Sequence, residues 1–226
     1  MRLYSGPLSL FARKVEIALR EKGLVFERVM VPFSQERGYA PKHPDVLAAN
    51  PKGQVPLLID GDLTVFDSTI ILEYLEDAYP DPPLYPATPR ARAECRLLEL
   101  FADEVLLVDI KRLMYRSEPP SGDVERRTRQ AEDGRQGEAA LRQRWAELES
   151  GLGGSEWFGR DSFSAADIAL FMAVLFTRRL HGPSFEGFPA LGAWFARAGA
   201  RPSVQPAAAE IAEADRVLSP ALARWS

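Results

Sequence analysis

The chain has 226 residues, of which 28 are Lys or Arg and 32 are Asp or Glu, so its formal net charge is −4 with both His neutral. Binding to nucleic acid needs clustered cations against the phosphates, and this mild acidity argues against such a partner. Hydrophobic residues make up 46% and charged residues 27%, as in an average globular protein, which excludes a largely disordered or fibrous chain.

Cysteine and histidine are too scarce for a disulfide framework or an obvious metal site. Cys95 is the single cysteine, and the opening residues lack the apolar core of a signal peptide, so we expect a cytoplasmic protein. The longest apolar run, residues 168–176, is far shorter than the roughly 20 residues that cross a bilayer, so no membrane span is expected. A zinc site would need His43 or His181 and carboxylates gathered from distant places, and we expect no metal.

Short strands alternate with helices in the first third of the chain. Residues 2–5 predict a strand, and the apolar spacing of residues 11–19 predicts a helix that Gly23 ends. Residues 25–31 predict a second strand, and a polar loop follows as far as Asn50.

A hairpin and a second helix complete this region. Residues 56–59 and 63–66 predict two strands, because the Asp-Gly pair at 60–61 supplies the positive φ angles of a tight primed turn. Asp67 and Ser68 then open a helix that runs to about residue 79, with apolar side chains on one face.

Five prolines between residues 80 and 89 predict an extended linker. We therefore expect one domain over residues 1–79, a proline-rich linker over 80–89 and a second domain over 90–226. The β signal largely disappears in the second domain, which we expect to be all helical, with helices over residues 90–116, 124–149, 165–180 and 189–198.

Two glycine-rich stretches of the second domain have different interpretations. Residues 118–137 combine prolines, glycines and charges, which predicts a mobile loop and a frayed helix start. The cluster Gly151-Leu152-Gly153-Gly154 follows a helix rather than a strand, so it indicates a helix stop and not a phosphate-binding loop.

Three segments of the first domain carry candidate binding chemistry, and the first is Val55-Pro56. A proline at the start of an apolar strand cannot donate a ladder hydrogen bond, which favours a cis Val55–Pro56 bond in a tight turn. Such a bend frees the N–H and C=O of Val55 to pair with an extended peptide as a short added strand.

The other two segments are helix starts. The unpaired amides at the second helix, with the Ser68 hydroxyl, can hold a carboxylate while Asp67 holds an ammonium group, and an α-amino acid terminus presents both. Ser68 can instead simply cap that helix. Ser9, at the start of the first helix, can stabilise a thiolate through its hydroxyl and the helix dipole, and can cap the helix at the same time.

Several other chemistries lack their motifs. The sequence contains no G-x-S-x-G elbow, G-x-x-x-x-G-K-[ST] loop, G-x-G-x-x-G turn, H-E-x-x-H pair or C-x-x-C. A hydrolase built from Ser9 and His43 would therefore have no recognisable nucleophile elbow.

In this order, the segments resemble the cytosolic glutathione transferase superfamily of bacterial type. Ser164 and Asp167 resemble its buried capping box, in which each side chain satisfies the other's backbone amide. The resemblance implies a thioredoxin-like βαβ-ββα domain, α/β in class, followed by an all-α domain. The matching segments are residues 9–15, 21–24, 50–56, 67–75, 163–169 and 201–204.

The resemblance also implies glutathione as co-substrate. The Val55 backbone, set by Pro56, would hold the cysteinyl part, and Asp67 and Ser68 would hold the γ-glutamyl amino and carboxylate groups. The family more often has Glu where this chain has Asp67. The residues expected near the glycyl carboxylate are Lys42, His43 and Gln54.

Ser9 would face the sulfur and stabilise a glutathione thiolate, which attacks an electrophilic apolar substrate. The pocket for this substrate would be lined by residues 101–115. Tyr4 and Ser5 are rivals for the activating hydroxyl, and we prefer Ser9. The resemblance further implies a homodimer.

Two alternatives remain open. Residues 3–7 and 82–86 also resemble the stringent starvation protein A group, whose members bind transcription machinery and lack transferase activity. The Asp-Ser-Thr sequence at 67–69 also resembles bacterial lignin-ether-cleaving relatives, so ether cleavage or dehalogenation would be a specialisation of the same chemistry.

Overall fold

The computed structural model describes residues 1–225, which form two compact units. The first unit contains Met1–Tyr85 together with Pro202–Leu218, and the second contains Pro86–Arg201 with the segment that begins at Ser219. The expected division kept everything after residue 90 together. The difference lies in helix α9 (Gln205–Leu218), which the sequence analysis did not predict and which belongs with the first unit.

A four-stranded mixed sheet forms the centre of the first unit, in the order β2-β1-β3-β4. Strand β1 (Arg2–Ser5) pairs in parallel with β2 (Glu27–Met30) and antiparallel with β3 (Leu57–Asp60), and β3 pairs antiparallel with β4 (Leu63–Phe66). Val25, predicted to lie in the second strand, is outside it and 91% exposed. The chain therefore has the predicted thioredoxin-like first domain.

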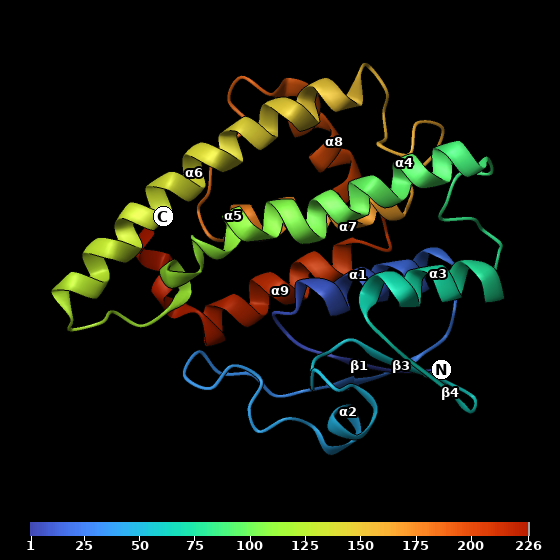
Figure 1. Cartoon of the computed structure of the whole chain (residues 1–226), viewed down its shortest axis with the longest axis horizontal. Coiled ribbons are helices and arrows are strands. Elements are labelled where there is room, and N and C mark those ends of the chain that lie inside the picture. Colours follow the sequence, from blue (N-terminus) through green and yellow to red (C-terminus); the bar gives the residue numbers. More distant parts are fainter. Residues whose placement is uncertain (226) are drawn as a thin grey trace. The chain divides into compact units, whose positions relative to one another are not determined.

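Helices cover both faces of this sheet, with α1 (Leu10–Glu21) and α3 (Ser68–Ala78) on one face and α2 (Pro44–Ala49) on the other (Figure 1). Helix α1 ends as predicted, since Gly23 has a φ of +65° directly after the C-cap residue. The prediction of a continuous polar loop before Asn50 is wrong, because α2 forms there. Its Pro44 occupies the first turn, where the missing N–H costs no hydrogen bond.

The β3–β4 turn is shifted by one residue from its predicted position. The strand register pairs Asp60 with Leu63, so Gly61 and Asp62 are the two central residues. Of these two, Gly61 alone has a positive φ, +62°. A positive φ at the first central position is the pattern of a type II′ turn, in which glycine is preferred at that position.

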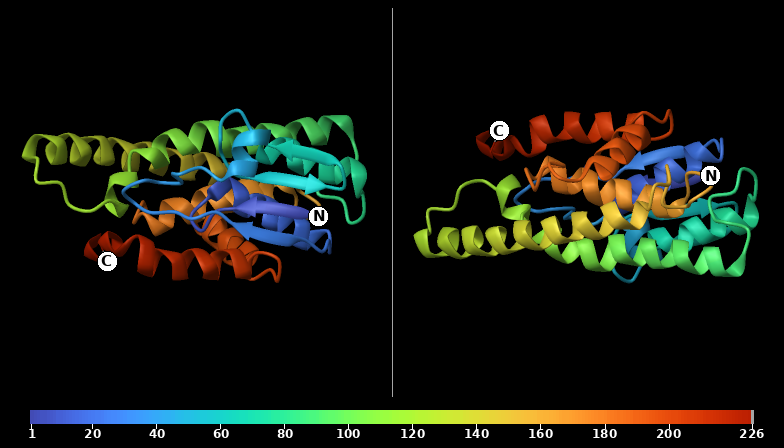
Figure 2. Two further views of the ribbon diagram at one scale, coloured as in Figure 1. Left: turned by 90° about the horizontal axis from the view of Figure 1, so that it is seen from below. Right: turned by 90° about the horizontal axis from the view of Figure 1, so that it is seen from above.

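Helix α9 packs against α1, and its Glu210 contacts Arg28 of β2; Figure 2 shows this red helix next to the blue amino-terminal segments. Ala207 and Ile211 are buried and spaced by four, so they form the stripe that faces the rest of the first unit. Residues from the two ends of the chain therefore share one packed unit.

The second unit is helical, as predicted, and its core is α7 (Ala165–Arg179), which is buried along nearly its whole length. The predicted capping box is present, with Ser164 and Asp167 each accepting from the other's backbone. The remaining helices are α4 (Pro89–Leu100), the π-helix η1 (Phe101–Leu106), α5 (Leu107–Lys111), the 3-10 helix η2 (Met114–Ser117), α6 (Val124–Leu152), α8 (Pro189–Gly199) and the 3-10 helix η3 (Pro220–Trp225).

Two glycines in α6 have a different role from the predicted one. The mobile loop expected over residues 118–137 ends at Asp123, the N-cap of α6, and both Gly134 and Gly137 are buried in that helix. A β-carbon at Gly137 would lie 2.9 Å from Arg112 Cβ, so glycine allows the helix to approach its neighbour closely. Gly153, with a φ of +54°, ends α6 as predicted.

Candidate functional site

Three candidate segments emerge at one end of the sheet. The register aligns Tyr4 of β1 with Leu57 of β3, and Leu57 with Phe66 of β4. The loop that leads to Ser9 follows β1, the Val55–Pro56 turn precedes β3, and Asp67 follows β4. Because β3 runs opposite to both neighbours, the end of β1, the start of β3 and the end of β4 meet at the same edge.

The Val55–Pro56 turn presents open backbone. The Val55–Pro56 bond is cis, and the half-buried Val55 side chain packs against the cluster that contains Tyr4 and Leu57. Within residues 1–225, neither the N–H nor the C=O of Val55 takes part in a hydrogen bond. Asn50 fixes the turn over residues 50–54, directly before Val55, since its Nδ2 donates to the Gln54 carbonyl at 2.7 Å.

Asp67 and Ser68 form the start of α3. Asp67 is the N-cap, because its carboxylate accepts from the Thr69 N–H at 3.1 Å and its carbonyl from the Ile71 N–H at 2.9 Å. The alternative in which Ser68 caps this helix is therefore wrong. The Ser68 hydroxyl makes no hydrogen bond in the described part of the chain, and Asp67 is exposed, so both keep capacity for a ligand.

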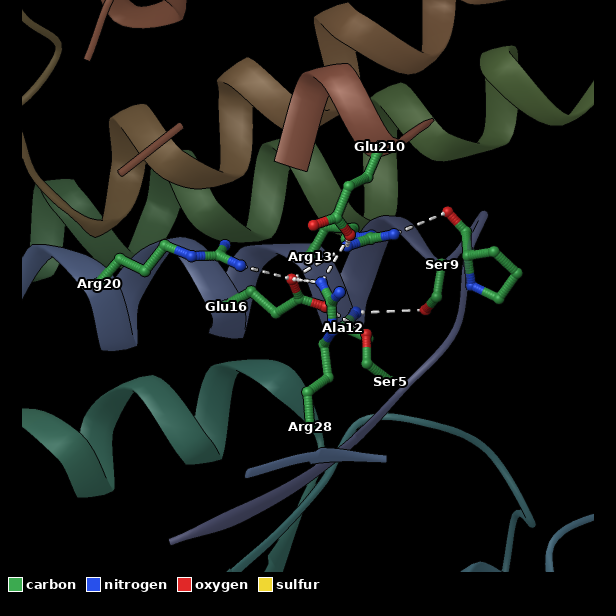
Figure 3. A network of polar contacts seen from close by, with 9 residues as sticks. Ser5, Ser9, Ala12, Arg13, Glu16, Arg20, Arg28 and Glu210 are labelled. Atoms are coloured by element: carbon green, nitrogen blue, oxygen red, sulfur yellow. Dashed lines mark hydrogen bonds and ion pairs between the residues drawn. The ribbon is translucent and has the colours of Figure 1, made fainter. Parts of the chain in front are cut away.

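Ser9 is the N-cap of α1 and is 8% exposed. Its Oγ accepts a hydrogen bond from the Ala12 N–H at 3.2 Å (Figure 3). Among residues 1–225 nothing accepts its own hydroxyl proton, so this proton can be donated to an anion at the helix start.

The two rival hydroxyls are engaged within the fold. The Tyr4 hydroxyl donates to the Asp45 carboxylate, and this hydrogen bond, together with burial, raises the pKa of Tyr4. The Ser5 hydroxyl donates to the buried carboxylate of Glu16 at 2.6 Å. Ser9 is thus the one of these three hydroxyls that keeps its proton for a ligand.

Lys42 and His43 lie just before α2. The His43 Nδ1 accepts from the Asp45 N–H at 3.3 Å, and its ring centroid lies 5.0 Å from that of Tyr4. The Lys42 stem runs next to the turn before Val55, with its Cγ 3.6 Å from where a β-carbon would stand on Gly53. Gln54 is exposed on the same turn. The structure thus brings Lys42 close to the Val55 turn, while the His43 nitrogen serves as a cap.

A group of buried charges around Glu16 of α1 was not predicted from the sequence. Glu16 is fully buried in α1 and accepts hydrogen bonds from the side chains of Ser5, Arg13, Arg20 and Arg28 (Figure 3). Arg13 also contacts Glu210 of α9 at 2.6 Å. Arg13 and Glu16 lie on the polar side of α1, opposite the apolar residues 11, 15 and 18, so the sequence pattern did not indicate that these charges would be buried.

The helical unit contains a hollow at the end of the stretch expected to line the acceptor. A cavity of about 340 Å³ is bordered by Tyr115, Pro119, Pro120, Ala131 and Trp225 among others. Tyr115 and Trp225 meet edge to face, with their ring centroids 5.7 Å apart, and give this hollow an aromatic wall.

Two further properties of the described residues bear on function. No helix among residues 1–225 combines the length and apolar character that a membrane span requires. The same residues contain no group of three or more His, Cys, Asp or Glu side chains placed to hold a metal ion.

Comparison with known proteins gives matches along most of the chain. A model of the glutathione S-transferase N-terminal domain matches residues 3–83, and one of the C-terminal domain matches residues 125–197. The chain is 35% identical over 183 residues to a stringent starvation protein A homolog of Coxiella burnetii, which covers 80% of this chain and 77% of that protein.

Two further comparisons extend over nearly the full length. The chain is 31% identical over 222 residues to glutathione S-transferase 3 of Zea mays, covering 93% of this chain and 94% of that protein. A solved structure of a glutathione S-transferase from Rhodospirillum rubrum F11 matches with a TM-score of 0.78 at 29% identity, over 91% of this chain and 90% of that one.

Proposed function

The chain belongs to the glutathione S-transferase superfamily, and we propose that it is a glutathione transferase whose first unit binds glutathione and activates its thiol. The observation that carries this proposal is the state of the Ser9 hydroxyl. It stands at a helix start with its oxygen anchored by the Ala12 N–H and its proton available, whereas the hydroxyls of Tyr4 and Ser5 are both engaged.

Glutathione would lie across the sheet end where the three segments emerge. The unpaired N–H and C=O of Val55 would pair with the backbone of the cysteinyl residue. The Asp67 carboxylate would hold the γ-glutamyl ammonium, and the Ser68 hydroxyl and the first amides of α3 its carboxylate. Lys42, beside the Val55 turn, would meet the glycyl carboxylate, with His43 and Gln54 near it.

Activation of the thiol follows from the surroundings of Ser9. A free thiol has a pKa near 8.5, and lowering it by about two units takes roughly 2.7 kcal/mol of differential stabilisation. A hydrogen bond to a charged group contributes about 1.5–3 kcal/mol, and a helix N-terminus adds about 0.3–1 kcal/mol. The Ser9 hydroxyl and the start of α1 together meet that requirement.

The reaction would be a nucleophilic attack by the thiolate on an electrophilic carbon. The thiol proton passes to solvent, the sulfur–carbon bond forms, and the leaving group departs with the electrons of its bond. Ser9 stabilises the sulfur anion before attack and is not itself modified. Because position 9 carries a hydroxyl, the protein has no thiol there for a mixed disulfide, which favours conjugation, addition, isomerisation or peroxide reduction.

Calorimetric titration with glutathione tests the proposal. We expect the chain to bind glutathione and to conjugate it to a chloronitrobenzene, and Ser9→Ala to slow conjugation while binding persists. Asp67→Asn is the matched variant for the amino-acid end. Asparagine keeps the N-cap at this positive φ of 75° but removes the charge, so it should weaken binding without lowering the melting temperature. An absence of binding heat at millimolar glutathione would contradict the proposal.

A second candidate function is that of a non-catalytic binding protein. It is favoured by the 35% identity over 183 residues to a stringent starvation protein A homolog. In that case the chain would neither bind glutathione nor conjugate it, and it would co-purify with a protein partner. The homodimer expected from the family resemblance is compatible with either function.

A further inference from the structure

The turn that presents Ser9 is held by Arg13. The Ser9 N–H donates to the Gly6 carbonyl at 3.2 Å, which closes a turn with Pro7 at its second position. The Arg13 Nη2 donates to the Pro7 carbonyl at 3.3 Å, and the Arg13 N–H donates to the Ser9 carbonyl at 3.1 Å. Arg13 therefore contacts this turn through both its side chain and its backbone.

Arg13 is in turn fixed by a closed ring of four charged side chains. Its Nη1 lies 3.0 Å from Glu16 Oε2 and 2.6 Å from Glu210 Oε2. Arg28 of β2 contacts the same two oxygens, at 3.0 Å and 2.6 Å. Each guanidinium thus bridges both carboxylates, and Arg13 and Glu16 are almost fully buried.

Glu210 is the member of this ring that comes from the far end of the chain. Partial burial alone would raise the pKa of Glu210, but the hydrogen bonds from Arg28 and Arg13 hold it below its usual range. Glu210 therefore stays ionised at neutral pH, and its loss would leave Arg13 with Glu16 as its remaining carboxylate. Arg20 also pairs with Glu16, and within residues 1–225 it makes no hydrogen bond to the turn.

We propose that Arg13 is a positioning residue for the Ser9 hydroxyl and that Glu210 of α9 holds Arg13 in the productive place. The acidity of bound glutathione is thereby set in part by a residue in the last helix of the first unit. This inference rests on the proposed function. It goes beyond that function because Arg13 would act through the Gly6–Ser9 turn and Glu210 through Arg13.

Two substitutions separate positioning from simple support of the fold. Glu210→Gln keeps the side-chain volume but places a neutral amide between two guanidinium groups. Arg13→Lys keeps the charge, but a single ammonium cannot reproduce the planar fork that reaches Pro7 and both carboxylates. In both variants we expect the pKa of bound glutathione to rise by about half to one unit, a fraction of what a charge-assisted hydrogen bond supplies. The dissociation constant should stay within about twofold, because Val55, Asp67 and Ser68 are unaltered.

Matched controls come from the same helices. Glu213→Gln removes a carboxylate of α9 that is exposed and pairs with Arg216, and Arg20→Lys alters a guanidinium that contacts Glu16 without reaching the turn. Both should titrate like the unmodified protein. Arg13→Lys provides the test if Glu210→Gln lowers the folded fraction, and circular dichroism identifies the variants that are folded.

The experiment is a pH titration of thiolate absorbance in the glutathione complex of the full chain, with the dissociation constant measured separately. A raised midpoint in Glu210→Gln and Arg13→Lys, with affinity retained and the controls unchanged, supports the inference. If the pKa of bound glutathione is lowered in the unmodified protein and stays equally low in both variants, the inference is overturned. The proposed function is then left intact. Loss of affinity in step with stability, without a shifted midpoint, shows a structural role and also overturns it. Failure of the unmodified protein to bind glutathione overturns both.

Discussion

The hydroxyl of Tyr4 in β1 donates a hydrogen bond to the carboxylate of Asp45 in α2. This contact joins the centre of the sheet to the short helix beside Lys42 and His43, and the His43 ring packs against Tyr4. Tyr4 therefore organises one wall of the candidate site. Because this hydrogen bond raises the pKa of Tyr4, the phenol is a poor stabiliser of a second anion.

Substitution of Tyr4 separates support of the site from activation of the thiol. We expect Tyr4→Phe to weaken glutathione binding and to lower the free energy of unfolding by about 1–2 kcal/mol, because a partly buried hydrogen bond to a carboxylate is lost. The pKa of bound glutathione should not change. Ser9→Ala should show the opposite pattern, a pKa raised by one to two units with little loss of affinity. A Tyr4→Phe complex whose thiol titrates near that of free glutathione would assign activation to Tyr4.

Gly137 in α6 tests the close approach between helices of the second unit. Alanine normally stabilises a helix interior by about 1 kcal/mol relative to glycine. At Gly137 a β-carbon would lie 2.9 Å from Arg112 Cβ and 3.0 Å from the Asp109 carbonyl oxygen. We therefore expect Gly137→Ala to destabilise the protein by about 1–3 kcal/mol.

Gly151→Ala in the same helix is the control for that substitution. Its new β-carbon would meet Phe158 at 3.7 Å, an ordinary van der Waals distance. Thermal unfolding should show a lower melting temperature for Gly137→Ala and an equal or higher one for Gly151→Ala. Equal melting temperatures for the two variants would mean that α6 can move away from Arg112 and Asp109 without a loss of stability.

Asp60 accepts hydrogen bonds from two tyrosines, Tyr79 at 2.6 Å and Tyr74 at 2.7 Å. The hydrogen bond to Asp60, followed by burial, raises the pKa of Tyr74 to about 12. We expect Asp60→Asn to bring the phenolate titration of Tyr74 back towards its usual value near 10. Asp62→Asn, on the adjacent turn, should leave it unchanged. Phenolate absorbance against pH, with Tyr74→Phe to assign the signal, measures the effect.

The same cluster gives a dependence of stability on pH at the alkaline end. A tyrosine whose pKa is higher in the folded state than in the unfolded chain contributes stability below the unfolded value. That contribution disappears as pH rises from about 10 through the folded value of about 12. Denaturant unfolding should therefore show a difference between the unmodified protein and Asp60→Asn at neutral pH that narrows above pH 10. A difference that stays constant across this range would contradict the coupling.

The carboxylate of Asp167 in α7 accepts hydrogen bonds from several groups of the second unit. Its Oδ1 accepts from the Phe158 N–H and the Trp194 Nε1–H, and its Oδ2 from the backbone N–H and hydroxyl of Ser164 and from the Gly159 N–H. Asp167→Asn places an amide donor against those donors, so we expect a loss of about 3 kcal/mol or more in the free energy of unfolding. Ser164→Ala, which removes one cap, should cost about 1 kcal/mol. Chemical denaturation of both variants measures the two losses of unfolding free energy, and the loss in Asp167→Asn should be the larger.

The sequence predicted those parts of the site that depend on short runs of adjacent residues. Ser9 before a helix, Val55-Pro56 before a strand and Asp67-Ser68 at a strand–helix junction are local signatures, and the structure places all three at one sheet edge. Helix α2 escaped prediction because six residues are too few to show a helical period.

Other features depend on contacts that no local pattern records. Gly134 and Gly137 resemble helix breakers in sequence, and their role as close-contact positions is visible only against Tyr115 and Arg112. The partnership of Arg13 with Glu210 joins residues 197 positions apart. Its recognition requires the folded chain, since the sequence gives no register between α1 and α9.

The ring of Arg13, Glu16, Arg28 and Glu210 sets an order of events during synthesis. A ribosome makes three members of the ring early and the fourth only after residues 86–201 of the helical unit have been translated. Until then the nascent amino-terminal unit holds two arginines around a single carboxylate. A messenger cut short before codon 210 would yield a product that cannot complete its first unit, even though every residue of the sheet is present.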